Sequence, residues 1–183
     1  MSHYYTGVGS RQTPSEVLKV MQELAKYLAK RGLVLRSGAA NGADTAFEEG
    51  CDSIDPHRKQ IFVPWKGFNG RAGFETGVVL RIDPECQTKA AEIASHIHPA
   101  WERLSQGAKT LHTRNVYQVL GPDVQTPSRF LVCWAPVGKN EEPKGGTRTA
   151  VMIARQAGIR TYNLALDADL RHIQTLLGST TSE

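Results

Sequence analysis

Residues 4–35 read YYTGVGSRQTPSEVLKVMQELAKYLAKRGLVL and contain a complete strand–helix–strand unit. Tyr4–Gly9 is a short β-prone run that ends in glycine. Apolar residues then recur at steps of three and four through 17–28, which predicts an amphipathic helix, and Gly32 is a typical helix stop. Leu33–Leu35 is a second β-prone run. Strands joined through a helix usually pair in parallel with a right-handed crossover, so this unit predicts a parallel sheet.

The beginning of this helix carries its own signal. Thr13 is expected as the N-cap, and Pro14 suits the first helical position. Glu16 follows three residues after Thr13, as in a capping box. We therefore expect the helix to begin at Thr13.

The same alternation continues along the chain. Further strands are expected at 59–63, 130–134 and 159–163, and further helices around 44–51, 87–96, 109–120, 147–157 and 167–177. Phe130–Trp134 is apolar throughout, as expected of a central strand that is buried on both faces. The alternation predicts a single-domain, doubly wound, Rossmann-like α/β fold with a mainly parallel sheet of about five or more strands. We expect this domain to span residues 1–178, with a frayed tail at 179–183.

Composition narrows the class of protein. The chain has 183 residues, and 22 Lys and Arg against 18 Asp and Glu give a net charge of +4. No apolar run is long enough to span a bilayer, and the first residues do not resemble a signal peptide. The three cysteines are an odd number at no metal-like spacing, so we expect reduced thiols, no metal site and a cytoplasmic location.

Three glycine-bearing turns each follow an expected strand and precede an expected helix. They are Gly7–Arg11, Ser37–Ala43 and Gly145–Thr147. In doubly wound folds ligands bind beyond the carboxyl ends of the strands, and helix N-termini there attract anions such as phosphate. Each turn taken singly is equally compatible with a tight connection and no ligand. Their recurrence, each with a hydroxyl side chain, favours a crevice that holds phosphate.

None of these turns is a standard cofactor fingerprint. Gln12 occupies the place of the last glycine in G-x-G-x-x-G, and no G-x-x-x-x-G-K-[ST] loop occurs in the chain. We therefore expect no resident cofactor and no P-loop triphosphatase activity.

The candidate ligand-binding residues come from these turns and from two other segments. Arg11 is suited to clamp a phosphate, and Asp44 either caps its helix or accepts a hydrogen bond from a ribose hydroxyl. Arg71 lies in a long loop that is suited to close over a ligand. Asn115 is a poor helix former within an expected helix, which hints at a site. The full candidate set is Gly9, Ser10, Arg11, Ser37, Gly38, Asn41, Gly42, Asp44, Arg71, Arg114, Asn115, Gly145, Gly146 and Thr147.

The turns resemble those of the SLOG superfamily of Rossmann-like proteins, which includes the DNA processing protein A family and the cytokinin-activating phosphoribohydrolases. Gly9-Ser10-Arg11, followed by the stretch 37–44, is similar to the DNA processing A pattern G-S-R … S-G-x-A-x-G-x-D. The C-terminal portion, with Arg114-Asn115 and Gly145–Thr147, is more similar to small stand-alone SLOG proteins of bacteria and their phages. The resemblance implies a Rossmann-like fold that binds single-stranded DNA or a nucleotide at these turns.

Departures from the pattern leave alternatives open. Asn41 stands where DNA processing A proteins commonly carry Arg. The phosphoribohydrolases use a catalytic glutamate in G-G-x-G-T-x-x-E, and that position holds Ala150 here. A nucleotide N-glycoside hydrolase would need another carboxylate, for which Glu48 and Glu75 are the candidates. A protein–protein or sensor role with an empty crevice is the third reading, and the sequence leaves homo-oligomerisation open. We expect no membrane partner.

Overall fold

The computed structural model describes residues 3–179 as one α/β domain. Its six strands are β1 (Tyr4–Gly9), β2 (Val34–Ser37), β3 (Lys59–Phe62), β4 (Val78–Val79), β5 (Phe130–Trp134) and β6 (Arg160–Asn163). Its helices are α1 (Ser15–Lys30), α2 (Ala43–Asp52), α3 (Pro84–Ile97), α4 (Gln106–Leu120), α5 (Thr147–Gln156) and α6 (Asp167–Gly178). Short 3-10 turns lie at Phe68–Gly70, Trp101–Arg103 and Lys139–Glu141.

The sheet is parallel throughout, in the order β4-β3-β2-β1-β5-β6. The chain builds outward from β1 in one direction as far as β4, and then crosses back to place β5 on the other side of β1. This reversal makes the β1–β5 pair the topological switch point, where Gly9 lies opposite Trp134. The doubly wound, Rossmann-like fold expected from the sequence is confirmed.

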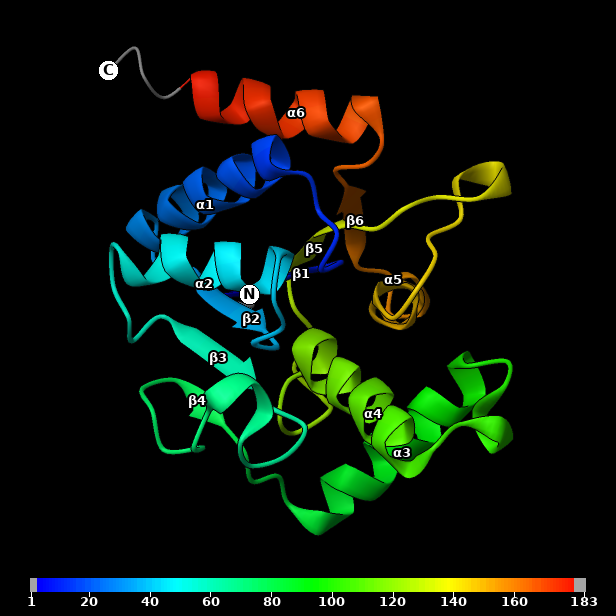
Figure 1. Cartoon of the computed structure of the whole chain (residues 1–183). Helices are drawn as coiled ribbons and strands as arrows, with labels where there is room; N and C mark the ends of the chain where they lie inside the picture. Colours follow the sequence, from blue (N-terminus) through cyan, green and yellow to red (C-terminus); the bar gives the residue numbers. More distant parts are fainter. Residues whose placement is uncertain (1–2, 180–183) are drawn as a thin grey trace.

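Helices cover both faces of the sheet, which is seen between them in Figure 1. One face carries α1, α2 and α6, and its core includes Met21 and Phe47. The other face carries α3, α4 and α5, and its core includes Val116 and Ile153. β5 contributes to both cores because its side chains alternate between the faces: Val132 packs on the first and Cys133 on the second.

The structure differs from the sequence predictions at three helix starts and at one strand that was not predicted. The N-cap of α1 is Pro14 and no side chain caps it, because the Thr13 hydroxyl donates to the Ser10 carbonyl instead. Helices α3 and α4 begin three residues earlier than expected, with N-caps from the side chains of Asp83 and Ser105. The edge strand β4, at Val78–Val79, has only two residues, too few to show a sequence pattern.

The two ends of the expected domain lie partly outside the described residues. Of the expected tail at 179–183, only Ser179 is described, and its N–H donates to the Thr175 carbonyl as the C-cap of α6. Residues 180–183 lie outside the description, as do residues 1 and 2. Within residues 3–179, no helix is long and apolar enough to cross a membrane.

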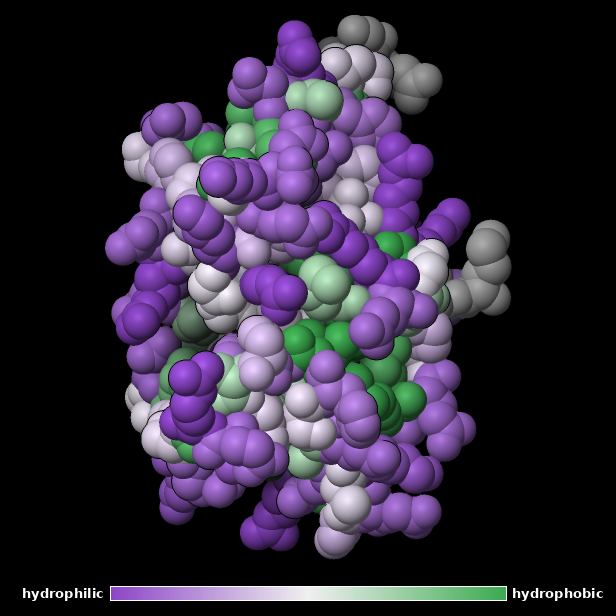
Figure 2. All heavy atoms as spheres, turned by 90° about the vertical axis from the view of Figure 1, so that its right-hand side faces the viewer, coloured by the Kyte–Doolittle hydropathy of each residue, from purple (hydrophilic) through white to green (hydrophobic). Residues whose placement is uncertain are grey.

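The segment between β5 and α5 projects from the body of the molecule, as the yellow ribbon of Figure 1 shows. A single antiparallel bridge between Val137 and Pro143 closes it into a narrow arm. Seen from this side, the surface is mainly hydrophilic, with an area of apolar atoms near its middle (Figure 2). The arm matters for the site because its last residues lead directly into the N-terminus of α5.

Candidate functional site

A cavity of about 480 Å³ opens beyond the carboxyl ends of β1 and β5, at the topological switch point. Its walls come from the turn after β1, the turn before α2, the helix α4 and the N-terminus of α5. Phe68 and Asn69, from the long loop after β3, complete the lining. A cavity of this size in this position is where a doubly wound fold binds its ligand.

Exposure separates the lining residues into a mouth and a floor. The mouth consists of exposed residues, namely Arg11, Gln12, Asn41, Asn69, Lys144, Gly145 and Gly146. The floor consists of buried residues, namely Val8, Asp44, Arg114, Asn115, Gln118 and Ala150. Free positive charge therefore lies at the entrance, while the floor combines apolar groups with enclosed polar groups.

The turn after β1 is held rigidly against its neighbours. The Ser10 N–H donates to the Trp134 carbonyl at 2.9 Å, which continues the β1–β5 pairing beyond the strands. Gly9 has no room for a side chain, because a Cβ there would lie 2.7 Å from the Ala43 Cβ. Arg11 follows this turn, is exposed, and has no ion pair within residues 3–179. Its guanidinium is free to meet an anion.

The turn before α2 packs directly on the first turn. Gly42 has φ +85°, and a Cβ at this position would lie 2.7 Å from the Ser10 carbonyl oxygen. Both the left-handed backbone and the close approach therefore require glycine. Gly42 is the N-cap of α2, which has no side-chain cap. The first two glycine turns thus form one continuous wall of the cavity.

Asp44 lies in the first turn of α2 and is 3% exposed. Burial raises the pKa of its carboxyl group to about 6, and this effect outweighs the Arg114 charge and the N–H groups of Ala40, Gly9 and Gly38, which favour the ionised form. The Ala40 N–H donates to Oδ2 at 3.3 Å. Asp44 therefore ties the first two turns together and is also one of the residues lining the cavity.

Arg114 crosses the floor beneath these turns. Its Nη1 donates to the carbonyl oxygens of Gly38 and Phe62, and its Nε donates to the Asn115 side chain at 3.3 Å. Its guanidinium carbon lies 5.6 Å from the centre of the Phe68 ring. The Arg114 guanidinium thus contacts the end of β2, the end of β3 and the loop residue Phe68, and holds these three segments together.

The third glycine turn forms the opposite side of the mouth. α5 begins at Thr147 and its N-terminus has no side-chain cap. The Asn115 side chain donates to the Gly146 carbonyl at 3.2 Å, so α4 holds this turn in place. Lys144 precedes the turn and lines the cavity, and no ion pair involves it in the described chain. An uncapped helix N-terminus beside a free lysine is suited to bind an anion.

Most of the residues proposed from the sequence meet at this cavity. Those that line it are Gly9, Ser10, Arg11, Asn41, Asp44, Arg114, Asn115, Gly145, Gly146 and Thr147. Ser37, Gly38 and Gly42 belong to the same turn but do not line the cavity themselves. The Ser37 hydroxyl donates to the Gly7 carbonyl at 2.6 Å, and a Cβ on Gly38 would collide with the side chains of Gln118 and Arg114.

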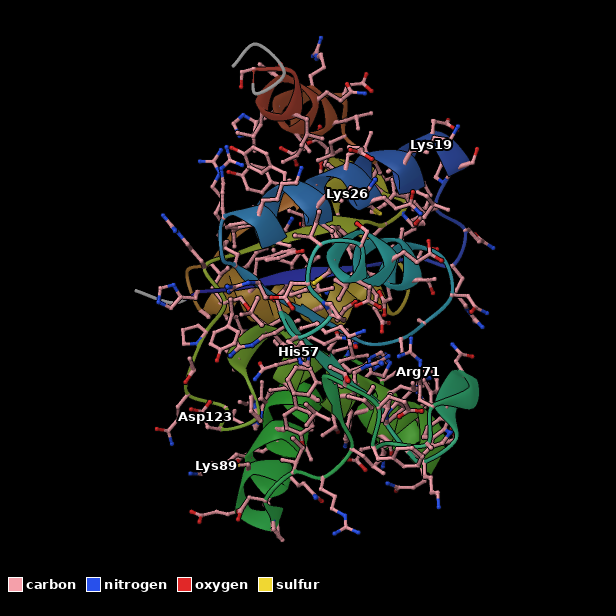
Figure 3. All side chains as sticks on the ribbon, turned by 90° about the vertical axis from the view of Figure 1, so that its left-hand side faces the viewer. Lys19, Lys26, His57, Arg71, Lys89 and Asp123 are labelled. Atoms are coloured by element: carbon pink, nitrogen blue, oxygen red, sulfur yellow. The ribbon has the colours of Figure 1, made fainter. Side chains whose placement is uncertain are left out.

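Arg71 and the two proposed catalytic glutamates lie outside the lining. Arg71 donates twice to Glu48, at 2.8 and 2.6 Å, and Lys59 donates to the same carboxylate at 2.8 Å. In Figure 3, Arg71 lies beside the ribbon of the loop after β3, below α2. Glu75 accepts from the N–H groups of Ala72 and Gly73 within that loop. Both glutamates are therefore engaged in holding local structure.

Several lining residues were not singled out from the sequence. Lys144 lies directly before Gly145-Gly146, and this adjacency to a glycine turn is a signal that was available. Leu111 and Gln118 share a face of α4 with Asn115, at spacings of four and three residues. Asn69 could not be foreseen, because its place depends on the course of an irregular loop, where its side chain donates to the Ala39 carbonyl at 2.8 Å.

His112 adds a titratable group to the lining. Its Nδ1 lies 2.8 Å from the Thr149 hydroxyl, and its ring lies 4.5 Å from that of His98. Burial lowers the pKa of His112, and the neighbouring His98 and Arg114 lower it further. Within residues 3–179 no group of three or more His, Cys, Asp or Glu residues is placed to hold a metal ion.

Comparisons with known proteins give a distant likeness to a solved structure. No protein family model matches the chain, and no curated protein matches it. Among solved structures, it is similar to DNA processing protein A from Helicobacter pylori, described for its single-stranded DNA binding mode. The likeness covers 96% of this chain and 80% of that chain, with 17% identity and a TM-score of 0.40. A likeness at this level assigns no family to the chain.

Proposed function

We propose that this protein binds a phosphate-bearing nucleotide, either free or as a unit of a single-stranded nucleic acid, in the cavity at the β1–β5 switch point. The observation that carries the proposal is the mouth of the cavity. It brings together the exposed and unpaired Arg11 and Lys144 with the uncapped N-terminus of α5. These groups offer charge and N–H donors, which phosphate oxygens accept.

The balance of charge around the cavity supports an anionic ligand. Arg11, Lys144 and Arg114 line it, and Asp44 is its single acidic lining residue. Burial raises the Asp44 pKa to about 6, so part of this negative charge is removed near neutral pH. The positive charge is local, and it acts at short range on a ligand that has already entered the mouth.

The size of the cavity favours one nucleotide unit. Its volume of about 480 Å³ lies within the ~300–1,000 Å³ typical of small-molecule sites. A longer strand would place one unit inside and continue across the exposed mouth. Phe68, which flanks the cavity with its ring near Arg114, offers an aromatic surface to a base.

Binding titrations test this proposal. The four nucleoside 5′-monophosphates and a 12-residue single-stranded oligonucleotide are titrated at two salt concentrations. We expect Arg11→Ala to weaken binding about tenfold, because charge-assisted contacts with phosphate contribute roughly 1.5–3 kcal/mol. A steep salt dependence with the oligonucleotide alone would indicate that several phosphates are bound.

The matched control is Lys19→Ala, an exposed lysine on α1 that is not among the residues lining the cavity. It removes the same unit of charge and is expected to leave affinity unchanged. Equal losses in the two variants would mean that net charge, and not the cavity, binds the ligand. The absence of binding by every probe would overturn the proposal.

Hydrolysis of a nucleotide N-glycosidic bond is the second candidate, and it is favoured by the position of Asp44. Glu48 and Glu75 lie outside the lining, whereas Asp44 lines the cavity and has a raised pKa. A carboxylate there would stabilise positive charge on the ribose while water adds to C1′ and the base leaves with a proton. Chromatography of nucleoside monophosphates incubated with the protein decides this. Free base that disappears with Asp44→Asn would support hydrolysis, and no free base would exclude it.

A further inference from the structure

We infer that the floor of the cavity recognises the edge of a nucleobase through the side-chain amide of Gln118. This inference rests on the proposed function and assigns the two ends of the ligand to the two ends of the cavity. The phosphate lies at the mouth, and the base enters the floor.

Gln118 is an enclosed polar residue whose side chain lacks a partner. The residue is 2% exposed and lines the cavity. Its backbone carbonyl accepts from the hydroxyls of Thr6 and Ser128, but no hydrogen bond in the described chain involves its side-chain amide. Among the described residues, the one completely enclosed side-chain polar atom without a partner is the Tyr5 hydroxyl. The Gln118 amide must therefore retain contact with the open space of the cavity.

The surroundings of Gln118 hold this amide in place. Gln118 lies near the C-terminal end of α4, where its backbone is fixed by Thr6 of β1 and Ser128. The amide packs against Gly38, where any side chain would collide with it. Gly38 thus leaves the space that the Gln118 amide occupies. The strand β1 and the turn after β2 set the direction of the amide.

The chemistry of an amide distinguishes between the parts of a nucleotide. A phosphate accepts hydrogen bonds only, so the amide oxygen would face it unfavourably, and the free cations lie at the mouth. A nucleobase edge presents a donor beside an acceptor, which matches the paired donor and acceptor of glutamine. The apolar residues Val8, Leu111 and Ala150 line the cavity near this floor and suit the faces of a flat ring.

Binding of four nucleoside 5′-monophosphates and of ribose 5-phosphate, measured by calorimetry, tests this inference. Ribose 5-phosphate keeps the sugar and the phosphate but lacks the base. The wild type is expected to bind at least one nucleotide about tenfold more tightly than ribose 5-phosphate. Gln118→Met preserves the length and shape of the side chain and removes the amide. This variant is expected to bind that nucleotide about fivefold to a hundredfold more weakly, while its affinity for ribose 5-phosphate is unchanged.

Arg11→Ala provides the complementary variant, since it is expected to weaken nucleotides and ribose 5-phosphate alike. Gln118→Glu replaces the amide donor with an acceptor in the same shape, and it is expected to change the order of preference among the bases. This variant decides the matter if circular dichroism shows that Gln118→Met does not fold.

The outcomes separate this inference from the proposed function. Equal binding of nucleotides and ribose 5-phosphate by the wild type would overturn the inference and leave the phosphate site standing. The inference is also overturned, and the phosphate site left standing, if Gln118→Met lowers the affinity for all probes equally. It is likewise overturned if Gln118→Glu keeps the order of preference among the bases. Failure of every probe to bind the wild type would overturn the proposed function, and the inference with it.

Discussion

Asp44 shows how a single residue serves both the wall and the chemistry of the cavity. Its position at the N-terminus of α2 lets it accept from N–H groups of the first two glycine turns. The same burial that makes these contacts possible opposes ionisation, and the nearby Arg114 compensates only in part. Asp44 therefore stabilises the two turns as a hydrogen-bond acceptor, while its burial disfavours the ionised carboxylate.

This conflict predicts a particular dependence of stability on pH. The pKa of Asp44 rises from 3.8 to about 6 on folding, so the folded state binds the proton more tightly than the unfolded state. The contribution of Asp44 to the free energy of unfolding is fully present below about pH 4. It falls by about 3 kcal/mol as the pH rises through 6. The Asp44→Asn side chain cannot ionise. The free energy of unfolding of this variant should therefore rise relative to that of the wild type as the pH increases across this range. Urea denaturation between pH 4 and 8 measures the difference.

The control for this prediction is Glu23→Gln, which changes an exposed carboxylate on α1. Its difference from the wild type is expected to remain small at every pH. A difference between Asp44→Asn and the wild type that stays constant from pH 4 to 8 would contradict the assigned pKa.

At the scale of elements, the loop 64–77 is tied to α2 by an ion-pair cluster. Glu48 is buried and pairs with both Arg71 and Lys59, and Lys59 also pairs with Asp52 at 2.7 Å. Burial alone would raise the Glu48 pKa, but the hydrogen bonds and charges of Arg71 and Lys59 together lower it. The cluster fixes the far side of the loop that supplies Phe68 to the cavity.

We therefore expect Arg71→Met to loosen this loop selectively. Lys59 remains beside Glu48, so the buried carboxylate keeps one partner and the loss in stability should be about 1–3 kcal/mol. Hydrogen exchange should accelerate in 64–77 more than in the strands, and nucleotide affinity should fall several-fold as Phe68 loses its position. Lys66→Met, at an exposed position in the same loop, is the control. Uniform acceleration across the sheet would contradict a local role.

The limits of sequence reasoning are clearest at this scale. Strands such as Tyr4–Gly9 and Phe130–Trp134 were predictable because their pattern is local and each is bounded by turn residues. The roles of Arg71 and Glu48 depend on a contact between residues 23 positions apart, which no local pattern records. Arg71 was expected to close over the ligand because it lies in a long loop, yet in the structure it pairs with the buried Glu48. The unpaired amide of Gln118 likewise emerges only when β1, α4 and the turn after β2 are packed together.

At the scale of the whole molecule, the net charge of +4 is small for 183 residues. In Figure 3, Lys19 and Lys26 lie together on α1, on the opposite side of the molecule from Lys89 on α3. A net charge this small gives the molecule as a whole little attraction for anions, so discrimination has to come from the few groups at the cavity. The switch point created by the strand order, which the sequence pattern alone did not specify, is what brings those groups together.

The three cysteines report on the whole fold because they lie in three different layers. Cys51 lies on α2, Cys133 in β5 and Cys86 on α3, and all three are free thiols. Burial, with a smaller contribution from Asp52, raises the pKa of Cys51 to about 11, and burial raises that of Cys133 to about 12. Since the thiolate is the reactive form, neither should react in the native protein, whereas Cys86 is partly exposed.

We expect a thiol reagent at pH 8 to modify one cysteine rapidly in the native protein and all three in denaturant. Mass spectrometry of the modified peptides should place the rapid reaction at Cys86. Cys86→Ser should abolish the rapid phase, and Cys51→Ser, which changes a buried thiol, should leave it intact. Slow modification of Cys51 and Cys133 would then follow opening of the two cores, at rates that rise with denaturant. Rapid native modification of Cys133 would contradict a central position of β5, and with it the switch point on which the cavity depends.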